Sequence, residues 1–199
     1  MNLDLGRALF STLDALDRLG IRYAIVGGLA VGAWGVSRST RDVDIYAELP
    51  PERRALERAL SEQGFHVPAM EEELERYGVF RSRSPDGVFV DIFPAVGPLG
   101  EAILERRKSI SVAGRPLWFI APEELAVLKA FSDRPRDFED LVNLSVVVGP
   151  KLDVLYIQQW ARRLDESLGG NEVSERVEDA LRQRKPAQQR KRKRPRTPR

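Results

Sequence analysis

The 199-residue sequence contains no cysteine, a single histidine and no apolar run of transmembrane length. The absence of cysteine excludes disulfide bonds and thiolate catalysis, and it fits a reducing compartment. The first twenty residues mix acids and arginines with apolar residues, which is not the pattern of a signal peptide. No stretch approaches the length of a membrane-spanning helix. We therefore expect a cytoplasmic protein without a membrane partner.

The net charge of +2 conceals two regions of opposite sign. From Arg182 to Arg199, ten residues are Lys or Arg and none is acidic, which leaves 22 basic and 30 acidic residues elsewhere, a net charge of −8. Residues 185–199 lack apolar periodicity and are predicted to be a disordered basic tail. Its densest block is Arg190, Lys191, Arg192, Lys193 and Arg194. Such a block either binds nucleic-acid phosphates or serves as a solubility tail or a dock for an acidic surface.

Strands and helices alternate early in the chain, and helices dominate later. Apolar runs predict strands at residues 23–26, 43–46, 77–83 and 88–93, and two more between 110 and 120. Helical spacing predicts helices at residues 4–19, 29–34, 50–64, 122–131, 138–148 and 152–168, and a short last helix capped by Asn171. This order predicts an α+β (mixed α/β) fold, with a short mixed sheet flanked by helices and a helical C-terminal part.

A glycine pair, Gly27-Gly28, separates the first predicted strand from the helix after it. Glycine backbones can approach an anion closely, and a helix N-terminus supplies free N–H groups and the positive end of a dipole. These properties suit a phosphate site. The alternative is a tight strand–helix turn that binds no ligand.

Three aspartates lie in apolar predicted strands. Alternation puts Asp42 and Asp44 on one face, about 6.6 Å apart along the strand, unless this is the solvent-facing side of an edge strand. Asp91 interrupts the apolar run 88–93, where an acid either pairs with an internal Arg or Lys or completes a metal site. Because magnesium prefers carboxylates and substrate phosphates, the three acids and the glycine pair predict a two-metal phosphoryl-transfer site.

This pattern resembles the DNA polymerase β-like nucleotidyltransferase superfamily, within it the branch of abortive-infection (AbiEii-type, type IV toxin–antitoxin) toxins. The similar residues are Gly27-Gly28, Gly35, Arg38, Thr40 and Asp42-Val43-Asp44. The likeness continues at Lys129 and at Arg134-Pro-Arg-Asp137-Phe-Glu-Asp140, and it covers roughly residues 20–145. The wider superfamily usually has Gly-Ser at the turn, whereas this sequence and the toxin-like branch have Gly-Gly.

The resemblance implies a role for each acid and each glycine. Asp42 and Asp44 would hold two Mg²⁺ ions, with Mn²⁺ as the alternative metal. Asp91 would ligate the metal that activates the acceptor hydroxyl, or act as its general base. Gly27 and Gly28 would donate N–H groups to the β- and γ-phosphates of a nucleoside triphosphate.

The remaining candidates carry charge or polarity toward the nucleotide. Arg38 would neutralise the triphosphate, and Thr40 is a further nucleotide-binding candidate. Lys129 would reach a phosphate as a point charge, unless it belongs to a solvated helix face. Asp137 and Asp140 lie on one side of a helix start, where they would orient Lys129 or Arg38 or complement the helix dipole.

We therefore predict a metal-dependent nucleotidyltransferase in which an acceptor hydroxyl attacks the α-phosphate and pyrophosphate leaves. Residues 1–120 would form the catalytic domain, and residues 121–184 would close the nucleotide cleft. The toxin-like branch and the basic tail favour RNA, such as tRNA, as the acceptor, with an antitoxin as a partner. The acidic body favours an alternative, a small-molecule enzyme of the aminoglycoside-modifying type. A different alternative is a non-catalytic nucleotide- or nucleic-acid-binding module on the same fold.

Overall fold

The computed structural model describes residues 3–50 and 53–184, so the predicted basic block at residues 190–194 lies outside the described residues. The chain divides into two compact units. The first contains the residues up to Ala33 together with Ser37–Leu125, and the second contains Trp34–Val36 and the residues from Ala126 onward. No helix of the described ranges is both long enough and apolar enough to cross a bilayer.

The first unit is built around a mixed six-stranded sheet with the strand order β3-β4-β2-β1-β6-β5. The pairs β1–β2, β3–β4 and β5–β6 are antiparallel, whereas β2 with β4 and β1 with β6 pair in parallel. Its elements are α1 (Leu3–Arg18), β1 (Tyr23–Ile25), α2 (Gly27–Ala33), β2 (Val43–Ala47), α3 (Arg53–Ser61), α4 (Met70–Tyr77), β3 (Phe80–Arg83), β4 (Phe89–Pro94), α5 (Gly97–Arg106), β5 (Lys108–Val112) and β6 (Arg115–Phe119). The predicted α+β fold class is confirmed.

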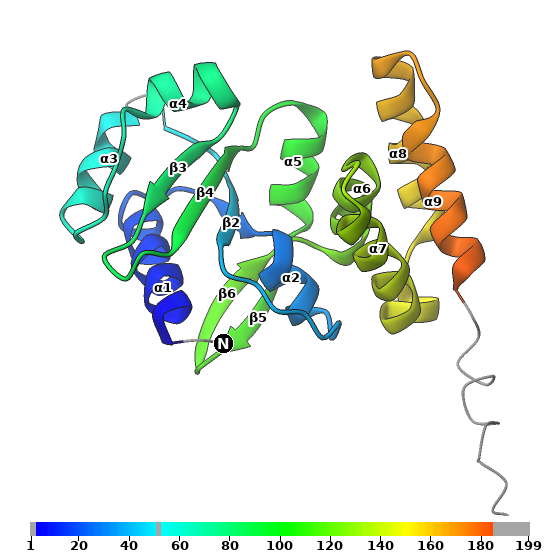
Figure 1. Cartoon of the computed structure of the whole chain (residues 1–199), viewed down its shortest axis with the longest axis horizontal. Helices are drawn as coiled ribbons and strands as arrows, with labels where there is room; N and C mark the ends of the chain where they lie inside the picture. The colour runs from blue at the N-terminus through cyan, green and yellow to red at the C-terminus, as the bar shows by residue number, and fades with distance from the viewer. Residues whose placement is uncertain (1–2, 51–52, 185–199) are drawn as a thin grey trace, which may run out of the picture. The chain divides into compact units, whose positions relative to one another are not determined.

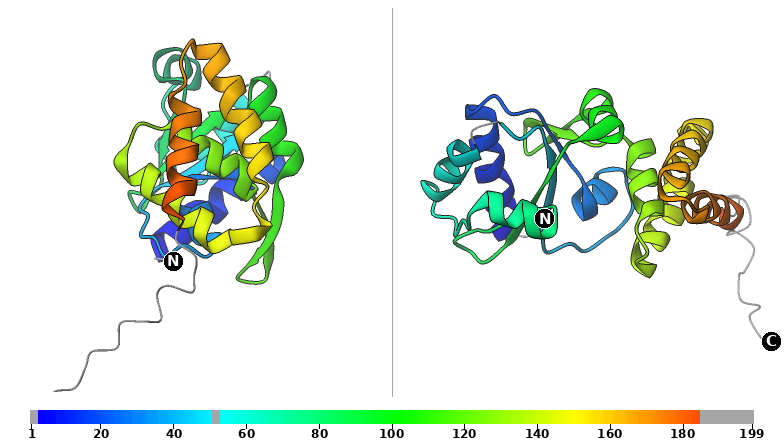
Figure 2. Two further views of the ribbon diagram at one scale, coloured as in Figure 1. Left: turned by 90° about the vertical axis from the view of Figure 1, so that its right-hand side faces the viewer. Right: turned by 90° about the horizontal axis from the view of Figure 1, so that it is seen from above.

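Helices cover both faces of this sheet. In Figures 1 and 2, α1 and α3 lie on one face, and α2 and α5 lie on the other. In β2 the residues Val43, Ile45 and Ala47 are fully buried, and they alternate with half-buried residues. The leucines of α1 at helical spacing, Leu9, Leu13 and Leu16, are equally buried. The apolar core therefore lies between α1 and the sheet face that α1 covers. The polar residues of β2 and β4 therefore point to the face that carries α2.

The second unit is helical. It contains most of α6 (Pro122–Phe131), then α7 (Pro135–Val148), the 3₁₀ turn η1 (Gly149–Lys151), α8 (Val154–Leu168) and α9 (Glu172–Gln183). Helix α9 packs against both α7 and α8. Its buried residues Val173, Val177 and Ala180 follow helical spacing, which accounts for this packing.

Three local predictions are corrected by the structure. The prediction of a strand from residue 77 is wrong, because Tyr77 ends α4 and Gly78, at φ 69°, donates its N–H to Leu74 as a left-handed cap. The predicted elements also lack two helices of the structure, α4 and α5. Asn171 occupies the N-cap position of α9 as predicted, but its side chain makes no cap hydrogen bond. Asp165 of α8 accepts hydrogen bonds from Val173 N and Ser174 N instead, both at 2.9 Å.

Candidate active site

Residues from three distant parts of the sequence meet in one row across the sheet. Asp44 of β2 lies in register with Asp91 of β4, and Asp91 lies in register with Arg81 of β3. Aligned residues on adjacent strands project to the same face, with the strands about 4.8 Å apart. The row ends beside the glycine pair, because Val26 N donates to the carbonyl of Asp44 at 2.9 Å and α2 begins at the next residue.

Arg81 holds Asp91 in a bidentate ion pair. Arg81 Nε lies 2.7 Å from Asp91 Oδ1, and Nη2 lies 2.6 Å from Oδ2. The carboxylate is buried, whereas 55% of the Arg81 side chain is exposed. Of the two interpretations that the sequence allowed for Asp91, the pairing with an arginine is present in the structure. Arg81 was not among the predicted site residues, although its place in the alternating run Phe-Arg-Ser-Arg was the available signal.

All three predicted metal ligands raise the pKa of Arg81. The hydrogen bond to Asp91 raises the pKa of Arg81, burial opposes this, and the charges of Asp91, Asp42 and Asp44 raise it further. Asp42 itself is exposed and lies one residue before β2, so it is not a strand residue as predicted. The aspartates nevertheless act together on one guanidinium, which makes this a single electrostatic site.

The glycine pair makes room for the side chains of the following segment. A Cβ on Gly27 would lie 1.9 Å from Asp44 Oδ2, and Gly27 has a φ of 58°. A Cβ on Gly28 would lie 2.7 Å from Thr40 Oγ1 and 3.1 Å from Arg38 Nε. The first turn of α2, Asp44 and the segment 38–40 therefore pack closely enough that both positions require glycine. Four predicted site residues are brought together here with Asp44.

The donor chemistry of the row suits a magnesium ion. Asp44 and Asp91 are neighbouring carboxylates on one face, and magnesium is usually bound by one or two carboxylates plus substrate phosphates. No group of three or more acidic or histidine side chains in the described ranges is arranged to hold a metal ion. At Asp91, both oxygens accept hydrogen bonds from Arg81.

Lys129, Asp137 and Asp140 form a buried charged cluster in the second unit. All three residues are less than 9% exposed, and Lys129 Nζ pairs with Asp137 Oδ1 and lies 3.1 Å from Asp140 Oδ2. Burial acts to raise the pKa of Asp137, but hydrogen bonds from Lys129 and Ser132 outweigh it and leave that pKa lowered. Lys129 is therefore not on a solvated helix face. Of the roles predicted for the two aspartates, orienting Lys129 matches these contacts.

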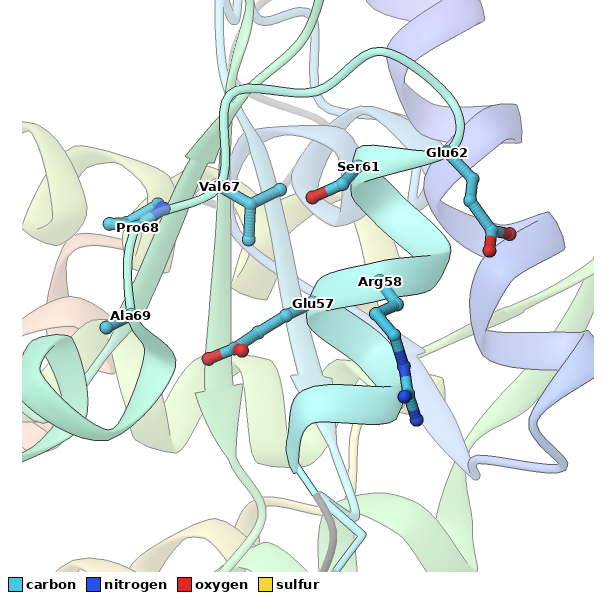
Figure 3. Close-up of a pocket in the computed structure, with 7 residues that line it drawn as sticks. All are labelled: Glu57, Arg58, Ser61, Glu62, Val67, Pro68 and Ala69. Carbon is cyan, nitrogen blue, oxygen red and sulfur yellow. The ribbon is translucent and has the colours of Figure 1, made fainter.

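A hollow in the surface of the first unit lies away from the candidate site. A cavity of about 350 Å³ is bounded by α3 and the segment 67–69 (Figure 3). Its lining residues are Glu57, Arg58, Ser61, Glu62, Val67, Pro68 and Ala69. None of the predicted site residues lines it, so the candidate site rests on the acidic row and not on this cavity.

The fold is similar to that of nucleotidyltransferases of known structure. The antibiotic-resistance factor ANT(2'')-Ia in solution gives a TM-score of 0.61 at 18% identity, over 84% of this chain and 95% of that one. Its crystal structure in complex with adenylyl-2''-tobramycin gives 0.57 at 21% identity, over 79% and 97%. The lincomycin-bound lincosamide antibiotic adenylyltransferase LnuA gives 0.52 at 18% identity, over 71% and 96%. At such identities the likeness establishes the fold alone.

Sequence comparison supplies the family. No curated protein matches this sequence. A family model described as "Nucleotidyl transferase of unknown function (DUF2204)" matches residues 6–183, which is most of the chain and includes the acidic row, the glycine pair and the Lys129 cluster. The match agrees with the fold and with the superfamily that the motif resembles. The protein therefore belongs to the DUF2204 family of nucleotidyltransferases.

Proposed function

We propose that this nucleotidyltransferase moves a nucleoside monophosphate from a nucleoside triphosphate to an acceptor hydroxyl. The acceptor oxygen forms a bond to the α-phosphorus, the bond from that phosphorus to the bridging oxygen breaks, and pyrophosphate leaves. The observation that carries the proposal is the register of Asp44 with Asp91 beside the Gly27-Gly28 turn. This juxtaposition supplies neighbouring carboxylates where a metal-bound triphosphate needs them.

Asp44 and Asp91 would hold Mg²⁺, or Mn²⁺ as the alternative, and Asp42, one residue before β2, would be the third ligand. Bound metal would neutralise triphosphate charge and favour ionisation of the acceptor hydroxyl. Asp91 would accept the acceptor proton if it acts as the general base. Arg38, packed at Gly28, is the candidate for contacting the triphosphate. The predicted phosphate roles of Thr40, of the glycine N–H groups and of Lys129 stay predictions.

For the acceptor we propose RNA, with tRNA as the first to test. The support is the motif resemblance to toxin-like nucleotidyltransferases and the basic block at residues 190–194, which suits a phosphate backbone. An antitoxin partner belongs to the same proposal. Deletion of residues 185–199 should then weaken RNA binding and make it less dependent on salt concentration.

A small cationic acceptor is the second candidate. The net charge of −8 outside residues 182–199 favours such a molecule. Structures of similar fold carry adenylyl-2''-tobramycin and lincomycin, which names two acceptors to test. A cationic acceptor should be unaffected by loss of the tail, which separates it from RNA.

The test is transfer of label from each α-³²P nucleoside triphosphate, with Mg²⁺, to total RNA, tRNA, tobramycin and lincomycin. The Asp44→Asn and Asp91→Asn variants are the controls, because each removes a charge while keeping the side-chain size. We expect label in one acceptor class. The rate of transfer should fall at least a hundredfold in both variants, which is the usual effect of removing a group that stabilises charge in a transition state. Metal-dependent nucleotide binding without transfer to any acceptor would replace this proposal with a binding module.

A further inference from the structure

Arg81 and a divalent metal ion require the same atoms. Both carboxylate oxygens of Asp91 accept hydrogen bonds from Arg81, at 2.7 and 2.6 Å. A carboxylate held in this bidentate way offers its best lone-pair directions to the guanidinium. We propose that Arg81 is a built-in counter-ion of the acidic row that competes with the divalent metal for Asp91 and is displaced when the metal binds. This inference rests on the proposed function, because it concerns the same metal site.

The acidic row explains why a counter-ion is present. Asp91 is only 7% exposed, and Asp44 lies in register beside it. Two neighbouring carboxylates in a partly buried place repel one another, and a buried charge without a partner is costly. Arg81 supplies the opposite charge and pairs with the buried carboxylate of Asp91 in the absence of a metal ion.

Arg81 is also free to leave. Its side chain is 55% exposed, so the guanidinium can move into water without breaking the core. A second contact can hold it nearby, since its Cζ lies 5.4 Å from the ring centroid of Phe89. Release would open both carboxylate oxygens of Asp91 to a metal ion, so the row would exchange one cation for another.

Arg83 provides a matched control. It lies two residues further along β3 on the same face, and its Cζ is 5.7 Å from the same Phe89 ring. Its guanidinium Nε lies 3.4 Å from the carbonyl of Gly87 and, within the described residues, it makes no ion pair. Removing Arg83 therefore removes an equal charge from the same surface without freeing Asp91.

The experiment measures Mn²⁺ binding by electron paramagnetic resonance, with a non-hydrolysable nucleoside triphosphate analogue, in wild type, Arg81→Gln and Arg83→Gln. We expect Arg81→Gln to bind Mn²⁺ about tenfold more tightly than wild type, because one charge-assisted bidentate pair no longer competes. Arg83→Gln should bind within about twofold of wild type, through the loss of distant charge alone. The rise in melting temperature on adding Mn²⁺ should be larger for Arg81→Gln than for either other protein.

The outcomes separate this inference from the proposed function. Equal or weaker Mn²⁺ binding by Arg81→Gln, with wild type binding normally, would overturn the competition and leave the proposed function standing. Equal gains in both variants would reduce Arg81 to general surface charge and overturn it as well. Absence of Mn²⁺ binding in all three proteins would overturn the proposed metal site itself. If Arg81→Gln does not fold, Arg81→Lys replaces it, since lysine keeps the charge but not the bidentate fork and should still bind Mn²⁺ more tightly than wild type.

Discussion

Gly27 should be the most sensitive glycine of the candidate site. In Gly27→Ala the new methyl group would lie 1.9 Å from Asp44 Oδ2 and 2.8 Å from Asp44 Cβ, so the Asp44 carboxylate must rotate away and the local backbone must also shift. The φ of 58° adds left-handed strain of about 1–2 kcal/mol for a residue with a Cβ. Relief of the clash should add roughly 1–3 kcal/mol, the usual cost of overpacking. We therefore expect the free energy of unfolding to fall by about 2–5 kcal/mol.

Gly20→Ala separates strain from displacement. Gly20 has nearly the same φ, 65°, but a methyl group there would meet no atom within 4 Å beyond its own chain neighbours. Its variant should lose only about 1–2 kcal/mol in urea unfolding and should keep full transfer activity. Gly27→Ala should lose about a hundredfold or more in kcat/KM, because moving a reactive group by about 1 Å has that effect. If the two variants matched in both stability and activity, the close packing of Asp44 on the glycine turn would be refuted.

Three further predictions concern the second unit. Lys129→Met should lower the free energy of unfolding, measured by urea titration, by about 3–5 kcal/mol, because Asp137 and Asp140 stay buried without their cation. As a control, Arg134→Ala removes a partner of Asp137 that is 81% exposed, and it should lower the free energy of unfolding by less than about 1 kcal/mol. Asp165→Ala should cost about 1–2 kcal/mol and speed amide exchange at the start of α9, because Val173 N and Ser174 N lose their acceptor. The folded pKa of Asp137 is lowered, so its contribution to stability is complete above the unfolded value of about 4 and is lost as the pH falls through the folded pKa. Urea titrations between pH 7 and pH 3 should show this loss, and Asp137→Asn should remove it; an unchanged pH profile in that variant would contradict the assignment.

Local pattern was enough for much of the fold. The alternation of β2 and the leucine spacing of α1 both appear in the structure as predicted, because each depends on a period within one segment. Helix α6 matches its predicted bounds at Pro122 and Phe131. The errors lie where a single residue or a distant partner determines where a helix begins or ends. Gly78 ends α4 and delays β3 to Phe80, and Asp165, not Asn171, accepts from the first N–H groups of α9.

The candidate site shows the same division. The sequence alone supplied the candidates, namely the glycine pair, the acids in apolar runs and a resemblance to a nucleotidyltransferase superfamily. Only the tertiary structure decided the partners, because strand register is set by pairing between segments almost fifty residues apart. That register places Asp44 beside Asp91 and allows Arg81 to form an ion pair with Asp91. Packing of the helices buries Lys129 between Asp137 and Asp140. Residue type fixes which charges are available, and three-dimensional packing fixes which of them meet.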